Sequence, residues 1–131
     1  MRREPTVPLK EEVKYGHGFF RGEKCPLSGE EGVLVMSPRH LDQFGRIMAG
    51  VLRHFPDKFD LEMDKQGWVE ASEFVEAIKT QRRHFHYLET RHLQAVVETD
   101  PKGRYQLENG RLRATYAHTL DLELDLPTDK N

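Results

Sequence analysis

Apolar residues recur at steps of three and four between residues 41 and 55, which is the spacing of one helix face. The stripe consists of Leu41, Phe44, Ile47, Met48, Val51, Leu52 and Phe55. Ser37 offers a side-chain oxygen that can cap free amides, and Pro38 suits the first helical position. Pro56 predicts that the helix ends at Phe55, because a proline disfavours the α region for the residue before it. Gly45 and Gly50 inside this helix cost about 1 kcal/mol each against alanine, which indicates close backbone packing.

Two further helices and a hairpin follow. Residues 70–81 place apolar side chains on one face, and Thr90 can cap a third helix that ends at the turn Thr99-Asp100-Pro101. Residues 66–69 form a short extended segment with a turn. Residues 105–114 alternate about the pair Asn109-Gly110, whose tolerance of positive φ favours a two-residue hairpin turn. Three helices followed by a hairpin is the order of a winged helix, with the hairpin as the wing.

The chain divides into three segments by composition. Residues 1–36 contain three prolines and five of the ten glycines without a sustained period, which predicts an irregular extension apart from the short apolar piece at 33–36. Residues 37–119 form the expected winged-helix-like lobe. Residues 120–131 alternate apolar and acidic positions, as a strand or a linker would. The predicted fold class is α+β: a winged-helix-like lobe with an irregular N-terminal extension.

Charge and cysteine content narrow the function classes. The net charge is −2 with 32% charged residues, so no global cationic field draws the molecule to nucleic acid and any anion site must be local. Cys25 is the only cysteine, which excludes an intrachain disulfide framework and fits a reducing compartment. We find no apolar run long enough to span a bilayer and no secretory signal, so the expected location is the cytoplasm.

Arg53 and His54 are the first candidates for chemistry, since they stand together where the first helix ends. Cations at a helix C-terminus stabilise it by about 0.3–1 kcal/mol through the dipole, which would be a purely structural role. The alternative is an anion site, in which arginine grips a phosphate with two donors and histidine adds a switchable one.

The hairpin supplies the second group of candidates. Arg111 and Arg113 face the side opposite Leu112, and His118 follows, which hints at phosphate contact. Lys102 and Arg104 form a basic turn at the hairpin entrance that could equally be a solvated loop.

Two histidine-containing groups have structural interpretations. The histidines at 84, 86 and 92 lie near arginines at 82, 83 and 91 without metal-ligand spacing, so they are interpreted as surface, with RNA backbone contact as the weaker alternative. His17 and Cys25 do not complete a four-ligand zinc site, because Ser28 stands where a CxxC pair needs its second cysteine. We therefore expect no bound metal, and at most a degenerate zinc knuckle in the extension.

Several motifs together resemble one known family. The chain contains in order LRH, D-x-x-G-W-V, KGRY, a hairpin ending LRA, and a terminal histidine. Residues 40–127 thereby resemble the amino-terminal lobe of the KptA-type RNA 2′-phosphotransferases, most closely their archaeal branch. The resemblance implies a winged-helix-like lobe that grips RNA and a second lobe, of the ADP-ribosyltransferase type, that holds NAD⁺.

The implied activity removes a 2′-phosphate left at a tRNA splice junction. In that family the phosphate attacks the nicotinamide riboside carbon and nicotinamide leaves. The ribose 2″-hydroxyl then displaces the RNA and gives ADP-ribose 1″,2″-cyclic phosphate. NAD⁺ is thus a co-substrate, and RNA bearing an internal 2′-phosphate is the partner.

The resemblance assigns roles to particular residues. Arg53, His54 and Arg113 match the residues that hold the 2′-phosphate and act in catalysis, and His118 matches the histidine that closes the hairpin motif. With Arg111, Lys102 and Arg104, His118 makes up the further RNA contacts we expect. Two family glycines are replaced here, by Ala117 and Asp60, and Ser28 interrupts a cysteine-rich knuckle that the archaeal branch often has.

The chain stops about where the family passes into its NAD⁺ lobe, whose nucleotide-binding motifs we do not find. We therefore expect the RNA lobe of the enzyme, inactive unless an NAD⁺ lobe is supplied in cis or in trans. One alternative is a non-catalytic winged-helix protein that binds nucleic acid without regard to a 2′-phosphate. Another is an interaction domain whose basic residues are only solvated.

Overall fold

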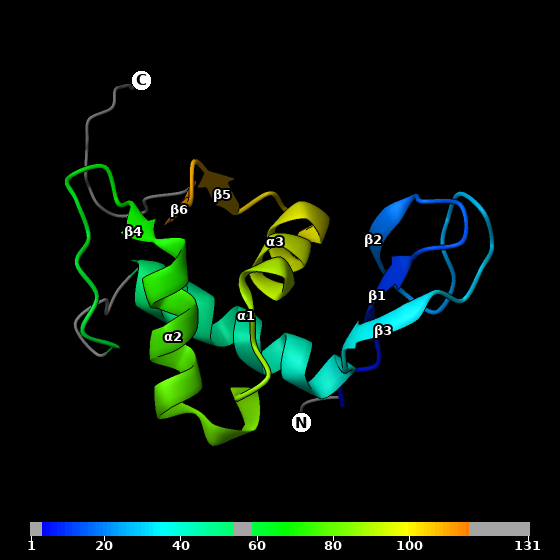
Figure 1. Cartoon of the computed structure of the whole chain (residues 1–131), viewed down its shortest axis with the longest axis horizontal. Helices are drawn as coiled ribbons and strands as arrows, with labels where there is room; N and C mark the ends of the chain where they lie inside the picture. The colour runs from blue at the N-terminus through cyan, green and yellow to red at the C-terminus, as the bar shows by residue number, and fades with distance from the viewer. Residues whose placement is uncertain (1–3, 54–58, 116–131) are drawn as a thin grey trace.

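The computed structural model describes residues 4–53 and 59–115 and shows a mixed α+β protein with two small antiparallel sheets (Figure 1). The elements in order are β1 (Leu9–Glu12), β2 (Gly18–Arg21), β3 (Val33–Met36), α1 (Pro38–Arg53), β4 (Val69–Glu70), α2 (Ala71–Gln81), the 3-10 turn η2 (Arg83–Phe85), α3 (Thr90–Thr99), β5 (Tyr105–Glu108) and β6 (Arg111–Ala114). In the described ranges, no helix is long and apolar enough to cross a membrane. The predicted fold class, α+β, is confirmed, and the winged-helix-like arrangement stays a prediction.

The first sheet corrects the expectation that the N-terminal extension is irregular. Its strand order is β2-β1-β3, and β1 pairs antiparallel with both neighbours. Each strand has four residues, too few for a visible alternation of apolar and polar positions. Four of the five glycines that suggested loops lie between the strands of this sheet, and Gly18 begins β2. Gly32 has φ +73°, and a Cβ there would lie 2.8 Å from the Glu11 carbonyl oxygen.

Helix α1 begins as predicted. The Ser37 hydroxyl accepts the His40 N–H at 3.2 Å, and the helix buries the stripe Leu41, Phe44, Met48, Val51 and Leu52. Its predicted end at Phe55 lies outside the described residues. The expectation of close packing at Gly45 and Gly50 is wrong, because a Cβ at either would meet no described atom within 4 Å.

The predicted helices at 70–81 and from Thr90 are present as α2 and α3. The predicted cap of α3 is off by one residue, because Glu89 precedes the helix and Thr90 is its first residue. The Nδ1 atom of His92 accepts the N–H of Glu89 at 3.0 Å, so a histidine takes the place that glutamate or glutamine has in a capping box.

The predicted hairpin is confirmed in register and turn. Glu108 pairs with Arg111, which leaves Asn109 and Gly110 as the two-residue loop at φ +54° and +75°. Strand β4 adds to the other edge of β6, giving the order β4-β6-β5. The Ala71 N–H donates to the Gly110 carbonyl at 2.9 Å, so α2 starts directly at the hairpin.

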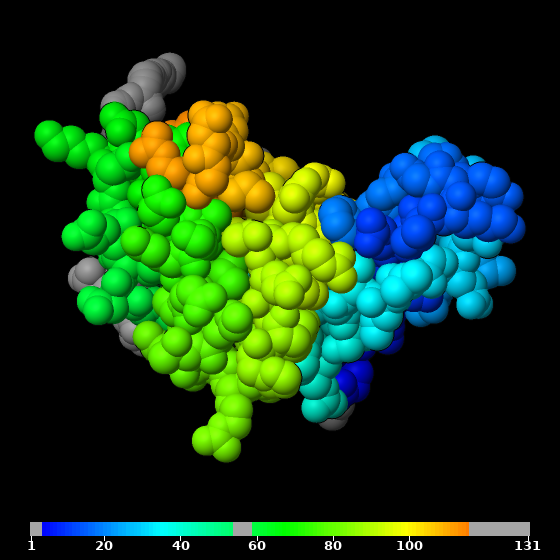
Figure 2. All heavy atoms as spheres, viewed as in Figure 1, coloured from blue at the N-terminus to red at the C-terminus, as the bar shows by residue number. Residues whose placement is uncertain are grey.

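One apolar core joins all the helices and reaches the first sheet. Phe44, Phe74 and Phe85 are fully buried, with ring centroids of Phe44 at 6.1 Å from Phe74 and 5.7 Å from Phe85. Leu9 and Met36 bring the first sheet into the same cluster. In the space-filling view the first sheet stands beside the helical body, next to α3 (Figure 2).

Candidate phosphate-binding site around the hairpin

Arg113 is held in place on the outer face of the hairpin. Its Nε donates to Gln106 Oε1 at 2.9 Å, and Nη1 donates to the Gln66 carbonyl at 3.3 Å. Its Cζ lies 4.5 Å from the centre of the Trp68 ring, a cation–π contact. These partners are neutral, so the guanidinium keeps its full charge in a fixed orientation. This is the arrangement that a phosphate site needs.

Arg111 shares the same face but is partly neutralised. Its Nη1 lies 3.4 Å from Asp64 Oδ2, and its Cζ lies 5.5 Å from the centre of the Trp68 ring. Asp64 also accepts the N–H groups of Gln66 and Trp68 at 2.9 Å each, which fixes the turn before β4. Arg111 therefore anchors that turn to the hairpin.

Arg53 is the last residue of α1, and its charge acts on Tyr105 of the hairpin. Burial raises the pKa of Tyr105, and the positive charges of Arg104, Arg53 and Arg21 partly offset this effect. Tyr105 pairs with Ala114, and its side chain points to the core side, away from Arg113. The convergence of Arg53 and Arg113 on one phosphate stays a prediction.

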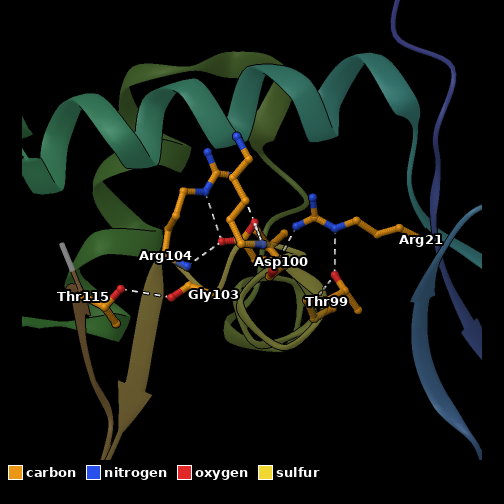
Figure 3. Close-up of polar contacts among 9 residues, drawn as sticks. Arg21, Thr99, Asp100, Gly103, Arg104 and Thr115 are labelled. Atoms are coloured by element: carbon orange, nitrogen blue, oxygen red, sulfur yellow. Dashed lines mark hydrogen bonds and ion pairs between the residues drawn. The ribbon is translucent and has the colours of Figure 1, made fainter.

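Arg104 has a clear structural role (Figure 3). Its Nε and Nη2 donate to the two carboxylate oxygens of Asp100 at 3.1 and 2.9 Å, and its backbone N–H donates to Oδ2 at 2.8 Å. Burial alone would raise the pKa of Asp100, but the Arg104 hydrogen bonds and charge lower it. Thr115 closes the turn by donating to the Gly103 carbonyl at 3.0 Å. The RNA contact predicted for Arg104 stays a prediction, and its guanidinium already serves Asp100.

Of the other predicted site residues, one lies in the described part of the chain and two do not. Lys102 is exposed in the turn before β5, where it can meet RNA. His54 and His118 lie outside the described residues. Of the predicted set, the structure thus brings Arg111 and Arg113 together on one face.

Sequence reasoning missed the supporting residues Trp68, Gln106 and Tyr105. Trp68 stands in the D-x-x-G-W-V motif, but nothing in the sequence showed that it stacks on strand β6. The Tyr105 hydroxyl is buried and has no hydrogen-bond partner among the described residues. An open hollow of about 630 Å³ lies beside Trp68, but Glu62, Asp64, Glu70 and Glu73 line it, so its charge repels phosphate.

The N-terminal sheet contains a buried polar centre around Glu12. The Sγ of Cys25 lies 3.8 Å from His17 Nδ1. Glu12, 1% exposed, accepts the N–H groups of Tyr15 and His17 and the Ser28 hydroxyl. Burial raises the pKa of Cys25, but hydrogen bonds from Ser28, Leu27 and His17 bring it to about 7. Within the described residues, no group of three or more His, Cys, Asp or Glu side chains could hold a metal ion.

Three archaeal proteins place the chain in a class. It is 40% identical over 92% of its length to "Probable RNA 2'-phosphotransferase 1" of Archaeoglobus fulgidus, of which it covers 55%. A "Probable RNA 2'-phosphotransferase" of Thermoplasma volcanium is 37% identical over 90% of the chain and 50% of that protein. The protein of that name from Methanosarcina barkeri is 36% identical over 83% of the chain and 51% of that protein. The class is therefore that of the RNA 2′-phosphotransferases.

The particular family follows from a sequence model that matches residues 39–130. Its description is "RNA 2'-phosphotransferase, Tpt1 / KptA family", and the chain belongs to this family. The resemblance seen in the sequence is thus confirmed. The chain spans about half the length of the curated relatives it matches.

Proposed function

We propose that residues 37–119 form a winged-helix-like RNA lobe of an NAD⁺-dependent RNA 2′-phosphotransferase that acts on spliced tRNA in the cytoplasm. In this proposal the hairpin is the wing, and a lobe of the ADP-ribosyltransferase type supplies the NAD⁺ site in cis or in trans. Without that lobe the chain binds its RNA but does not turn over. The family membership and the fixed Arg113 guanidinium support the proposal.

The charge of a phosphate monoester explains why arginines are needed. The monoester has close to two negative charges near neutral pH. At an effective dielectric of about 20, one cation about 4 Å away contributes roughly 4 kcal/mol before desolvation. Arg113 is pre-oriented by Trp68 and Gln106, so little side-chain entropy is lost when it binds.

The position of the proposed site follows from the two arginines. Arg53 acts near Tyr105, and Arg113 precedes Ala114, which pairs with Tyr105. Tyr105 and Arg113 point to opposite faces of the hairpin, so in this proposal the phosphate that contacts both guanidinium groups lies at the open end of the hairpin, beside the paired Tyr105 and Ala114. There Arg53, His54 and Arg113 bind the 2′-phosphate and stabilise the charge that grows on its oxygens as the RNA leaves. His118, Arg111 and Lys102 contact the neighbouring backbone.

The test compares two RNAs that differ only in an internal 2′-phosphate. We expect wild-type protein to bind the phosphorylated RNA more tightly than the unphosphorylated one. Arg113→Ala or Arg53→Ala should bind the phosphorylated RNA about 30-fold more weakly than wild type, because a hydrogen bond to a charged group contributes about 2 kcal/mol. Arg46→Ala is the matched control, because Arg46 lies on α1 and pairs with Asp42 at 3.2 Å. Equal affinity for both RNAs in the wild type would favour a non-catalytic nucleic-acid-binding domain.

Turnover is measured separately, by adding NAD⁺ and a separately produced NAD⁺ lobe. We expect phosphate removal only when the lobe is present, and loss of that activity in Arg53→Ala and Arg113→Ala. Persistence of the activity in either variant would contradict the site assignment.

A further inference from the structure

A second group of basic side chains lies at the far end of α2 from the hairpin. We name it the distal basic patch; its members are exposed and comprise Arg39, Arg82, Arg83, His84 and His86. The His40 ring joins its two parts, since it follows Arg39 in α1 and lies 5.3 Å from the His84 ring. The buried Phe85 fixes η2 against the core between them. The residues beyond α2 form the lower edge of the body in Figures 1 and 2.

Among the described residues, the patch has few carboxylate partners, whereas many other cations of the chain are paired. Elsewhere in the described chain, ion pairs join a carboxylate to Lys10, Lys14, Arg46, Lys79, Arg91, Arg104 and Arg111. Within the patch only Arg39 has such a partner, Glu4, and their side chains are 68% and 79% exposed. An exposed pair of this kind gives way readily to a stronger anion. The arginines therefore make the patch a positive region on a chain of net charge −2.

Folding stability does not account for the part of the patch at the start of α1, whereas Arg82 and Arg83 follow the C-terminal end of α2, where the helix dipole favours cations. Arg39 and His40 lie in the first turn of α1, which has no acidic residue. The helix dipole is positive at that end, so cations there are unfavourable. Burial lowers the pKa of His40, and the nearby charges of His84 and Arg39 lower it further. Arg39 stands at an unfavourable helix end, and a residue that breaks a local rule in this way indicates a role in binding.

We propose that the distal basic patch binds backbone phosphates of the RNA substrate, away from the nucleotide that bears the 2′-phosphate. The inference rests on the proposed RNA-binding function. Arg39 and Arg53 stand near the two ends of α1, which places them about 21 Å apart at about 1.5 Å per residue. One nucleotide advances a strand by only a few ångströms, so the patch would meet phosphates several nucleotides away. A substrate shorter than this span would not reach it.

The experiment uses the full chain, a 2′-phosphorylated trinucleotide, and a folded RNA of transfer-RNA size with the same internal 2′-phosphate. The test variant is the double substitution Arg82→Ala with Arg83→Ala. The matched control removes two charges from the same helical body, Arg46→Ala with Lys79→Ala, whose side chains already pair with Asp42 and Glu76. Thermal unfolding of both variants confirms that they fold.

We expect the test variant to bind the folded RNA about tenfold more weakly, with a salt-dependence slope less steep by about 1 to 2, and to bind the trinucleotide as wild type does. The control should bind both RNAs as wild type does. Unchanged affinity of the test variant for the folded RNA, or an equal loss in the control, overturns the proposal. Binding of wild type and of the test variant to anionic lipid vesicles is measured as well. If the test variant loses binding to the vesicles but not to the folded RNA, the proposal is also overturned.

The proposed function fails by a different result. If wild-type protein binds the folded RNA equally with and without its 2′-phosphate, the phosphate site is wrong. The comparison of the two double variants on the folded RNA still decides the distal basic patch.

Discussion

Glu12 in the first sheet and Asp100 before the hairpin have similar hydrogen-bond environments. Each is a buried carboxylate that accepts N–H groups from the turn that follows it: Tyr15 and His17 for Glu12, Lys102 and Arg104 for Asp100. Asp100 also has two guanidinium donors from Arg104, whereas Glu12 has the Ser28 hydroxyl and lies 3.6 Å from His17.

The difference lies in how each centre is connected to the rest of the fold. Asp100 lies between Arg104 and the arginine of the first sheet, Arg21, which donates to Val96 and Thr99 at the end of α3 (Figure 3). The Glu12 centre is confined to one sheet. Damage at Asp100 should therefore spread to the hairpin and to the contact between the two regions, whereas damage at Glu12 should stay local.

The largest effect is expected from Asp100→Ala. It leaves the Arg104 guanidinium and two backbone N–H groups without their acceptor, at a cost of about 3 kcal/mol in the free energy of unfolding. Urea unfolding measures it. Glu98→Ala is the control, because the exposed Glu98 only accepts from Gln94, and we expect a change within about 0.5 kcal/mol. Equal effects of the two substitutions would show that Asp100 is not an anchor.

Acid should separate the two centres. Burial raises the pKa of each carboxyl, but hydrogen bonds and charge lower both below their ordinary values of 4.5 for Glu12 and 3.8 for Asp100. A lowered folded-state pKa gives stability that is present above the unfolded value and lost as the pH falls through the folded one. The loss begins at the unfolded value, which is higher for Glu12, so we expect its onset in the first sheet at a higher pH than in the hairpin. Amide NMR signals of residues 9–36 and 100–115, followed below pH 4.5, test this order.

Gly32→Ala should affect the first sheet alone. Its Cβ would lie 2.8 Å from the Glu11 carbonyl oxygen and 2.9 Å from the Phe20 ring, at a φ of +73°. We expect a loss of about 2 kcal/mol and reduced hydrogen-exchange protection in β1 to β3. Gly45→Ala is the opposite control, because open space in a helix predicts a gain of about 1 kcal/mol. Loss of protection in the hairpin as well would mean that the two regions unfold together.

The two regions also differ in how far their sequences predict them. The hairpin has a regular alternation and an Asn-Gly turn, so its register followed from local chemistry. The first sheet has four-residue strands, and its buried centre is a glutamate, a residue type that is normally exposed. Sequence also indicated the cations of the site. It could not show that Arg104 would serve Asp100 or that Trp68 would hold Arg113, because these are contacts between separate elements.

The smallest effect concerns two tyrosine hydroxyls. The Tyr105 hydroxyl is buried without a hydrogen-bond partner among the described residues, whereas that of Tyr87 lies 3.0 Å from His40 Nδ1. An unmet buried hydroxyl costs free energy, so Tyr105→Phe should stabilise the protein by up to about 1 kcal/mol, and Tyr87→Phe should destabilise it by about as much. Urea midpoints of the two variants give both signs. Destabilisation by Tyr105→Phe would show that this hydroxyl has a hydrogen-bond partner. The buried polar group of the hairpin would then be hydrogen-bonded, as Glu12 is in the first sheet.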